Sequence, residues 1–278
     1  MPDWEEQMKQ AKEDVLLALD IWATVLKDVF GPRLEYAYAK GSAVKQWRTL
    51  VDYVPIISDL DIHIKMTDSN PLFPETYDGF FASINVCEEF EERFVSAKSE
   101  FLHIPRIQIV HLNPNLNDPM FILPQVGDVH AMVGSPDDAK LPKLEDVRRG
   151  DRKEMLGLEE YLGDLPRQAF DRVGLDFWQM LRGMNWRVSP APIRLLTQNH
   201  PSPLYVWKWN RTRIVKELRA NGYESIADSY KNFYETGWRL FLSKFTNHSD
   251  FRKIVVHGYN VLHGCLEEIK NLGHNQRV

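Results

Sequence analysis

Cysteine is scarce in this chain of 278 residues, and its histidines show no metal-binding spacing. Cys87 and Cys265, the two cysteines, lie far apart, and the nine histidines form no paired ligand motif. A zinc site with the usual cysteine and histidine spacing is therefore not expected. So few cysteines are typical of a reducing cytosol, and we expect both to be packing residues.

Long apolar runs and an excess of positive charge are also missing. No run approaches the roughly 18 apolar residues that span a bilayer, and the acidic start at Met1–Glu6 has no apolar signal core. A net charge of −5 gives no overall attraction to nucleic acid. We therefore expect a cytoplasmic protein without a membrane partner, which acts on a small molecule rather than on long nucleic acid. Homo-oligomer formation stays open.

The first half of the chain alternates between helical and strand patterns. A cap at Asp3 and a stop at Gly31-Pro32 predict a helix that ends at Phe30. A second helix is expected over 75–99. The predicted strands cover residues 34–39, 59–66, 106–112 and 129–133. This order indicates a small mixed sheet with helices against it.

The second half is predicted to be almost wholly helical. Composition shifts over 135–152, which is rich in Pro, Asp, Lys and Arg, so we divide the chain into domains 1–146 and 147–278. The expected fold class is α/β (α+β), a small mixed sheet domain followed by an all-α bundle with tryptophans in its core. Helices are expected over 158–162, 167–187, 190–198, 204–221, 223–244 and 249–272.

A glycine-serine turn followed by two acids is the most informative pattern. Gly41 and Ser42 end one predicted strand, and Asp59 and Asp61 begin the next. Side chains two apart on a strand point to the same face, so the two carboxylates should project together. Converging carboxylates repel unless a cation lies between them, and hard oxygen ligands suit Mg²⁺. The pattern predicts one or two Mg²⁺ ions on these acids and phosphoryl chemistry.

This arrangement resembles the nucleotidyltransferase superfamily that includes DNA polymerase beta and the aminoglycoside nucleotidyltransferases. The resemblance covers about residues 34–134 and is specific over 36–42 and 58–64. It implies a polymerase-beta-like domain followed, as in the aminoglycoside branch, by a helical domain. It also implies that the cleft between the domains takes a nucleoside triphosphate such as ATP.

The resemblance assigns roles to individual residues. Asp59 and Asp61 would be the catalytic metal ligands, and Gly41 and Ser42 would hold the phosphates through a close backbone approach and a hydroxyl group. Lys45 would offset triphosphate charge. The implied reaction is Mg²⁺-assisted transfer of a nucleoside monophosphate to a hydroxyl acceptor, with release of pyrophosphate.

Two features depart from the family pattern. The spacer between Ser42 and Asp59 has sixteen residues, which is longer than is common in the family. The family's third acid should lie on the strand over 106–112, which has no Asp or Glu. Gln108 is the candidate for that position. A neutral amide can contact a metal but cannot take a proton from an attacking hydroxyl.

Two interpretations of the missing acid stay open. In the first, another group replaces it, and the candidates are Glu145, Asp128, Asp118 and His63, the last of which shares the face of the two aspartates. In the second, the protein binds nucleotide without turning it over and acts as a sensor or a regulatory protein.

The helical half contains further candidate residues. Arg211, close to Trp209 and Arg213, would contact phosphate if its helix faces the cleft, and a solvated basic helix face is the alternative. Arg182, Arg187 and Arg194 carry the same ambiguity. Arg252 and His257 fit the loose Arg-x4-His pattern of HEPN ribonucleases, with a surface histidine as the alternative.

Overall fold

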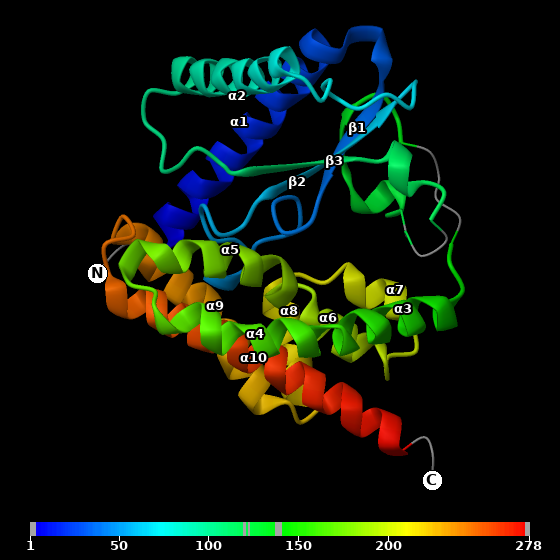
Figure 1. Cartoon of the computed structure of the whole chain (residues 1–278), viewed down its shortest axis with the longest axis vertical. Helices are drawn as coiled ribbons and strands as arrows, with labels where there is room; N and C mark the ends of the chain where they lie inside the picture. The colour runs from blue at the N-terminus through cyan, green and yellow to red at the C-terminus, as the bar shows by residue number, and fades with distance from the viewer. Residues whose placement is uncertain (1–3, 119–120, 122, 137–140, 276–278) are drawn as a thin grey trace. The chain divides into compact units, whose positions relative to one another are not determined.

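The computed structural model describes residues 4–118, 121, 123–136 and 141–275 (Figure 1). It has a mixed α and β architecture, with one small four-stranded sheet and many helices. The chain forms two compact units, Met1–Val44 with Ser58–Lys140 (unit 1) and Lys45–Ile57 with Leu141–Val278 (unit 2). The sequence-based division ran between 146 and 147 and kept residues 45–57 in the first domain, whereas these residues belong with the helices of unit 2.

The sheet of unit 1 has the order β3-β2-β1-β4. Strand β1 is antiparallel to both β2 and β4, while β2 and β3 are parallel, so the sheet is mixed as predicted. The four strands are β1 (Leu34–Lys40), β2 (Leu60–Met66), β3 (Ile107–His111) and β4 (His130–Val133). Each lies where a strand was predicted, because alternating apolar residues between turn-forming residues are a local signal.

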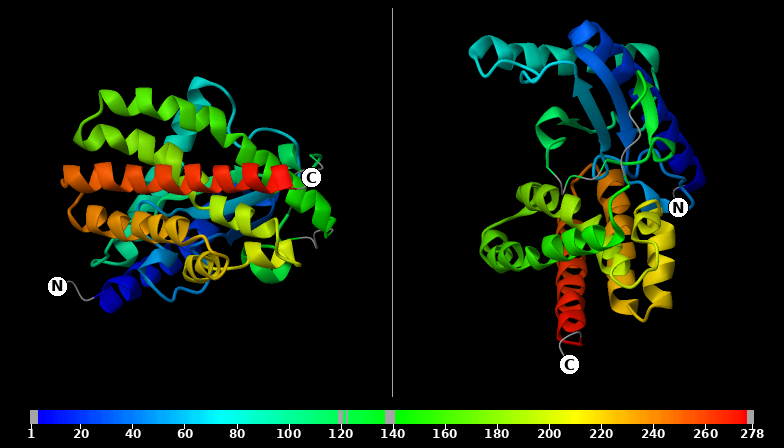
Figure 2. Two further views of the ribbon diagram at one scale, coloured as in Figure 1. Left: turned by 90° about the horizontal axis from the view of Figure 1, so that it is seen from below. Right: turned by 90° about the vertical axis from the view of Figure 1, so that its right-hand side faces the viewer.

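Two long helices accompany the sheet, α1 (Trp4–Phe30) and α2 (Tyr77–Ala97) (Figures 1 and 2). Helix α1 contacts β1 and β4 and also packs against α2, where Trp22 stacks on Phe90 with ring centroids 4.7 Å apart. Phe30 ends α1 as predicted, and the expected cap at Asp3 lies outside the described residues.

One face of the sheet is closed by an aromatic cluster. Tyr36 and Tyr38 on β1 form a buried cluster with Leu112, against which Phe121 and Leu123 pack. Side chains of alternate strand residues share a face, so Tyr36, Tyr38 and Lys40 lie on the same side of β1. The cluster therefore covers the middle of β1 on the face that Lys40 also shares.

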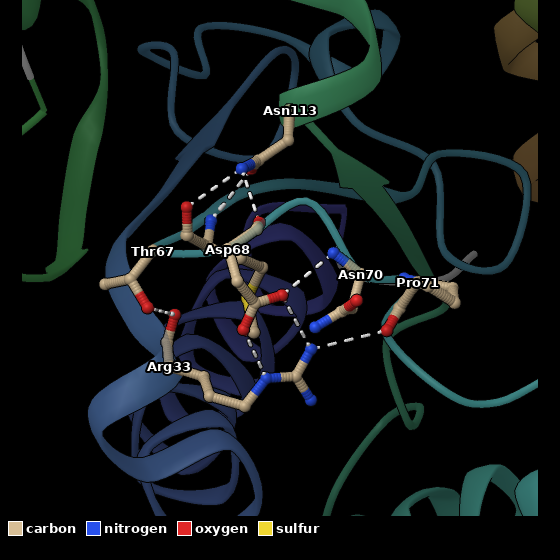
Figure 3. A network of polar contacts seen from close by, with 7 residues as sticks. Arg33, Thr67, Asp68, Asn70, Pro71 and Asn113 are labelled. Carbon is tan, nitrogen blue, oxygen red and sulfur yellow. Dashed lines mark hydrogen bonds and ion pairs between the residues drawn. The ribbon is translucent and has the colours of Figure 1, made fainter.

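The opposite end of the sheet is tied by a polar network (Figure 3). The Asn113 side chain donates to the carbonyls of Met66 and Asp68 and accepts from the Met66 amide. Arg33 forms a two-pronged ion pair with Asp68, with Nε 2.8 Å from Oδ2. These contacts join the start of β1, the end of β2 and the residues that follow β3.

A buried acid anchors the chain just before β3. Asp14 of α1 is fully buried and accepts hydrogen bonds from Lys98 Nζ and from the backbone amides of Leu102 and His103, at 2.7, 2.8 and 3.0 Å. Burial alone would raise the pKa of Asp14, but the hydrogen bonds from His103 and Lys98 outweigh it and hold this pKa below its usual value. The segment that leads to Arg106 is thereby fastened to α1.

Unit 2 is built from helices, and several differ from the prediction. The helices are α3 (Leu144–Leu156), α4 (Leu158–Phe170), α5 (Phe177–Val188), α6 (Ala191–Thr197), α7 (Pro203–Trp207), α8 (Arg211–Ala220), α9 (Glu224–Leu242) and α10 (His248–Asn275). The predicted helix over 167–187 is interrupted between α4 and α5, where Gly174 has a φ of +51°. The predicted helix over 204–221 is likewise divided into α7 and α8. Helix α3 lies where the shift in composition placed the domain boundary, and no helix was predicted there.

The spacer between the turn and the acids is part of the core of unit 2. Asp52 is buried and accepts from the Thr212 backbone amide and hydroxyl at the start of α8, at 2.8 and 2.7 Å. The indole of Trp238, fully buried in α9, donates to the carbonyls of Leu50 and Tyr53 at 2.9 Å. Residues 45–57 therefore form a strap held by α8 and α9. Across the described part of the chain, no helix combines the length and the apolarity needed to cross a membrane.

Candidate functional site

The predicted glycine and one predicted aspartate meet at the end of β1. Lys40 and Asp61 are partners in the antiparallel ladder of β1 and β2, so Gly41 follows directly beside Asp61. Gly41 has a φ of +81°, in the left-handed region that favours glycine, and a Cβ there would stand 2.5 Å from Asp61 Oδ2. The turn can pass this close to the carboxylate only because residue 41 has no side chain.

Asp59 lies just before β2 and is paired with an arginine. Arg106 donates from Nη2 to Asp59 Oδ2 at 2.8 Å, and the side chains are 18% and 16% exposed. The carbonyl of Arg106 also accepts from the Leu60 amide at 2.8 Å. The parallel pairing of β2 and β3 thus brings a guanidinium group to the first predicted metal ligand.

Gln108 lies beside the second aspartate. The register of β2 and β3 makes Asp61 and Gln108 direct partners. Paired residues of adjacent strands project to the same face, so the exposed Gln108 side chain lies on the side of Asp61. An acid at position 108 would have completed a set of three carboxylates. The chain has a neutral amide there.

His63 was a candidate replacement base, and its surroundings disfavour that role. It is buried, and its ring stacks on Tyr38 with centroids 5.2 Å apart. Burial, with the nearby positive charge of Lys40, lowers the pKa of His63 to about 3. A histidine with so low a pKa is a weak base and remains neutral at physiological pH.

The other candidate acids, Asp118, Asp128 and Glu145, lie in different surroundings. Asp118 is exposed, and Asp128 closes the 3-10 turn that precedes β4. Glu145 belongs to unit 2, where its 81% exposed side chain pairs with Arg148 at 2.7 Å. Within the described residues, no group of three or more His, Cys, Asp or Glu side chains is arranged to hold a metal ion.

The predicted phosphate contacts fall in different parts of the chain. Ser42 directly follows Gly41 in unit 1, whereas Lys45 and Arg211 belong to unit 2. Lys45 Nζ donates to the carbonyls of Trp207 and Trp209 at 2.7 and 2.9 Å, where α7 ends. This contact holds the start of the strap to unit 2.

Arg211 is buried rather than presented on a solvated helix face. Its guanidinium lies over the Tyr234 ring at 3.9 Å and donates to the carbonyls of Val51 and Asp52 at 3.3 Å. These contacts place the Arg211 guanidinium in the interior of unit 2. Arg187 is half-buried, and its guanidinium lies over the rings of Tyr161 and Trp186.

The HEPN-like pair lies on α10. Residues five apart on an α-helix are separated by about 140° around its axis, so Arg252 and His257 do not share one face. Burial, with the charges of Arg239 and Lys253, lowers the pKa of His257. The spacing therefore does not bring this pair together as an acid–base couple.

The local charges at the two aspartates are balanced. Asp59 pairs with Arg106, and Lys40 lies opposite Asp61 in the ladder of β1 and β2. Burial lowers the pKa of Lys40 overall, although the negative charge of Asp61 partly opposes this effect. The two carboxylates and the Gln108 amide offer hard oxygen donors, which fit Mg²⁺ if phosphates and water complete its shell. Sequence reasoning missed both cations, although Lys40 adjoins Gly41 and Arg106 opens the predicted third strand.

Comparisons with known proteins add no family assignment. A scan against protein-family models found no match, and searches of curated proteins and of solved structures found none either.

Proposed function

We propose that this protein is a nucleotidyltransferase that moves a nucleoside monophosphate from a triphosphate to a hydroxyl acceptor. The observation that carries this proposal is the approach of Gly41 to Asp61, with Asp59 two residues earlier. A glycine of positive φ lets the backbone lie against the carboxylate, so that backbone amides for a phosphate chain and an acid for its cation come together at one point.

Unit 1 supplies the groups for this reaction. Gly41 and Ser42 would contact the β- and γ-phosphates, and Asp59 and Asp61 are the acids that would hold Mg²⁺. When bound, Mg²⁺ would neutralise phosphate charge and polarise the phosphorus under attack. Lys40 and Arg106 lie next to these acids and offer further positive charge to the triphosphate.

A small hydroxyl compound is the proposed acceptor, and the cytoplasm the proposed location. The net charge of −5 opposes long polyanions. Cys87 and Cys265 are free thiols, which fits a reducing compartment.

Calorimetric titration tests the proposal. The four nucleoside triphosphates are titrated with and without Mg²⁺ into the wild-type protein and into the double variant Asp59→Asn/Asp61→Asn. We expect Mg²⁺-dependent binding that the double variant loses. The matched control is Asp68→Asn, which removes a carboxylate beyond the far end of the same strand and should leave binding intact.

Turnover is tested by pyrophosphate release in the presence of candidate acceptors. Asp59→Asn should lower the rate by orders of magnitude, because catalysis here consists of positioning and charge neutralisation. Wild-type turnover by Asp59→Asn would refute the assignment of Asp59.

Gln108 favours a second candidate function, a nucleotide-binding protein that does not turn its ligand over. Gln108 lies beside Asp61, where the family pattern has an acid. The neutral amide cannot activate the attacking hydroxyl as a carboxylate would. Under this alternative the wild-type protein binds Mg²⁺ and triphosphate without releasing pyrophosphate. Gln108→Asp would then be the variant in which to look for turnover.

A further inference from the structure

Arg106 is held in place from several directions. Its guanidinium meets Asp59 at 2.8 Å, and its carbonyl accepts from Leu60 at 2.8 Å. The preceding residues are fastened to α1 by the buried Asp14, which accepts from the backbone amides of Leu102 and His103. Both members of the ion pair are less than one-fifth exposed. The cation is therefore a built part of the site rather than a flexible surface charge.

The charge balance limits how many divalent ions the chain can hold by itself. Asp59 and Asp61 contribute two negative charges. Arg106, which pairs with Asp59, and Lys40, which interacts electrostatically with Asp61, contribute two positive charges, so these four groups are formally neutral. Gln108 adds an oxygen donor but no charge. A metal ion that arrives with a triphosphate brings its own counter-charge. A second ion would have to be held mainly by carboxylates that already face cations.

We propose that Arg106 takes the place of a second divalent ion, so that the site binds a single Mg²⁺ together with the triphosphate. This inference rests on the proposed function and specifies its metal requirement. The guanidinium has five N–H donors in a fixed plane, so it can hold the Asp59 carboxylate and still present donors to phosphate oxygens. Unlike a bound ion, it remains in place when the nucleotide leaves.

Counting bound Mn²⁺ tests the inference without any measurement of activity. Mn²⁺ replaces Mg²⁺, and paramagnetic resonance of the unbound ion gives the number bound per chain at a saturating level of a non-hydrolysable ATP analogue. We expect one Mn²⁺ per wild-type chain. Arg106→Met, which keeps the aliphatic stem but removes the charge, should bind two, whereas Arg106→Lys should bind one.

Arg33→Met is the matched control, because Arg33 pairs with Asp68 at the same 2.8 Å distance at the opposite end of the sheet. It should leave the count at one. Circular dichroism and analogue binding establish that each variant is folded. Two ions in the wild-type protein, or one ion in a folded Arg106→Met, would overturn the inference.

A titration of Mn²⁺ alone separates this inference from the proposed function. Removing the positive charge beside Asp59 should tighten Mn²⁺ binding by at least tenfold in Arg106→Met relative to wild type. If no analogue binds to the wild-type protein, the proposed function fails and this titration still decides the role of Arg106. Equal Mn²⁺ affinity in the two proteins would overturn the inference whatever the nucleotide result.

Discussion

The Asp61 carboxylate lies against the backbone of Gly41, so close that a methyl group on residue 41 would stand 2.5 Å from Oδ2. The two residues are twenty positions apart in the chain and come together because β1 and β2 pair with Lys40 opposite Asp61. A carboxylate in contact with a side-chain-free turn places an acid and an exposed stretch of backbone at one point. This is the geometry on which the proposed phosphate site depends.

Gly41→Ala should damage this site through steric displacement of Asp61. The alanine would be strained by its positive φ, at a cost of about 1–2 kcal/mol, and its Cβ would also push the carboxylate away. We expect triphosphate affinity, measured by calorimetry, to fall at least tenfold.

Gly222→Ala is the control for the backbone strain. Gly222 has a φ of +82°, nearly that of Gly41, but nothing lies within 4 Å of the Cβ position. This variant should be destabilised to a similar extent and bind nucleotide normally. If Gly41→Ala binds as tightly as Gly222→Ala, the contact with Asp61 has no part in nucleotide binding.

His63 should stay neutral across the physiological pH range. Burial and the charge of Lys40 lower its pKa to about 3, so protonation is confined to acid below that value. Nitrogen-detected NMR of the His63 imidazole should show constant shifts from pH 8 to pH 5. A His63 titration centred near pH 6.5 would contradict the prediction and restore His63 as a candidate base.

Asp52 should be a main determinant of the stability of unit 2. It accepts from Thr212 and also from the backbone amides of Arg48 and Thr49, at 2.7 and 3.1 Å. Asp52→Ala removes the acceptor of these partly buried hydrogen bonds, and urea unfolding followed by tryptophan fluorescence should show a loss of about 3 kcal/mol. Asp228→Ala, which removes a largely exposed partner of Arg219, should change little. Equal losses in the two variants would contradict this role.

Asp151 should make unit 2 less stable as pH rises from about 4 to 6. Burial raises the pKa of Asp151 to about 6, against hydrogen bonds from Thr197 and Trp207 that favour the ionised form. The folded state binds this proton more tightly than the unfolded chain. The contribution of Asp151 to the free energy of unfolding is therefore greatest below pH 4 and declines as pH rises through the folded pKa. The loss is about 3 kcal/mol for a shift of this size.

The measurement for Asp151 is the unfolding free energy of wild type and Asp151→Asn at pH 4 and pH 7. The difference in unfolding free energy between wild type and Asp151→Asn should change by about 3 kcal/mol between the two pH values. Glu154→Gln, which removes an exposed carboxylate near the same Arg194, is the control and should show no such change. A constant difference between wild type and Asp151→Asn would show that the carboxyl titrates at its ordinary pKa.

Two features of unit 2 differ from the sequence-based prediction. No helix was predicted over 144–156, because the shift in composition over 135–152 was interpreted as a domain boundary. Val147, Asp151 and Met155 nevertheless recur at intervals of four and form the buried stripe of α3. The break between α4 and α5 was not predicted. A glycine such as Gly174 within a helical pattern can either continue the helix or end it, and the packing of its neighbours decides between the two.

The long spacer could not have been interpreted from the sequence at all. Asp52 and Thr212 are 160 residues apart, and Arg106 and Asp59 are 47 apart. Neither pairing leaves a local pattern, because a hydrogen bond between distant residues depends on how whole elements pack. Lys45 and Arg211 were predicted to contact phosphate because their residue types suit that role. Their contacts with distant carbonyl groups in unit 2 could be identified only from the packed structure.

The sequence by itself determined the four strands, the glycine turn, the acids at 59 and 61, and the neutral residue at 108, because each is encoded by neighbouring residues and by the alternation of a strand. Only the tertiary structure decided that Arg106 faces Asp59, that His63 is buried and neutral, and that residues 45–57 belong to the helices. Those outcomes follow from strand register and burial, which bring together groups from distant parts of the chain and set the charge that each of them can carry.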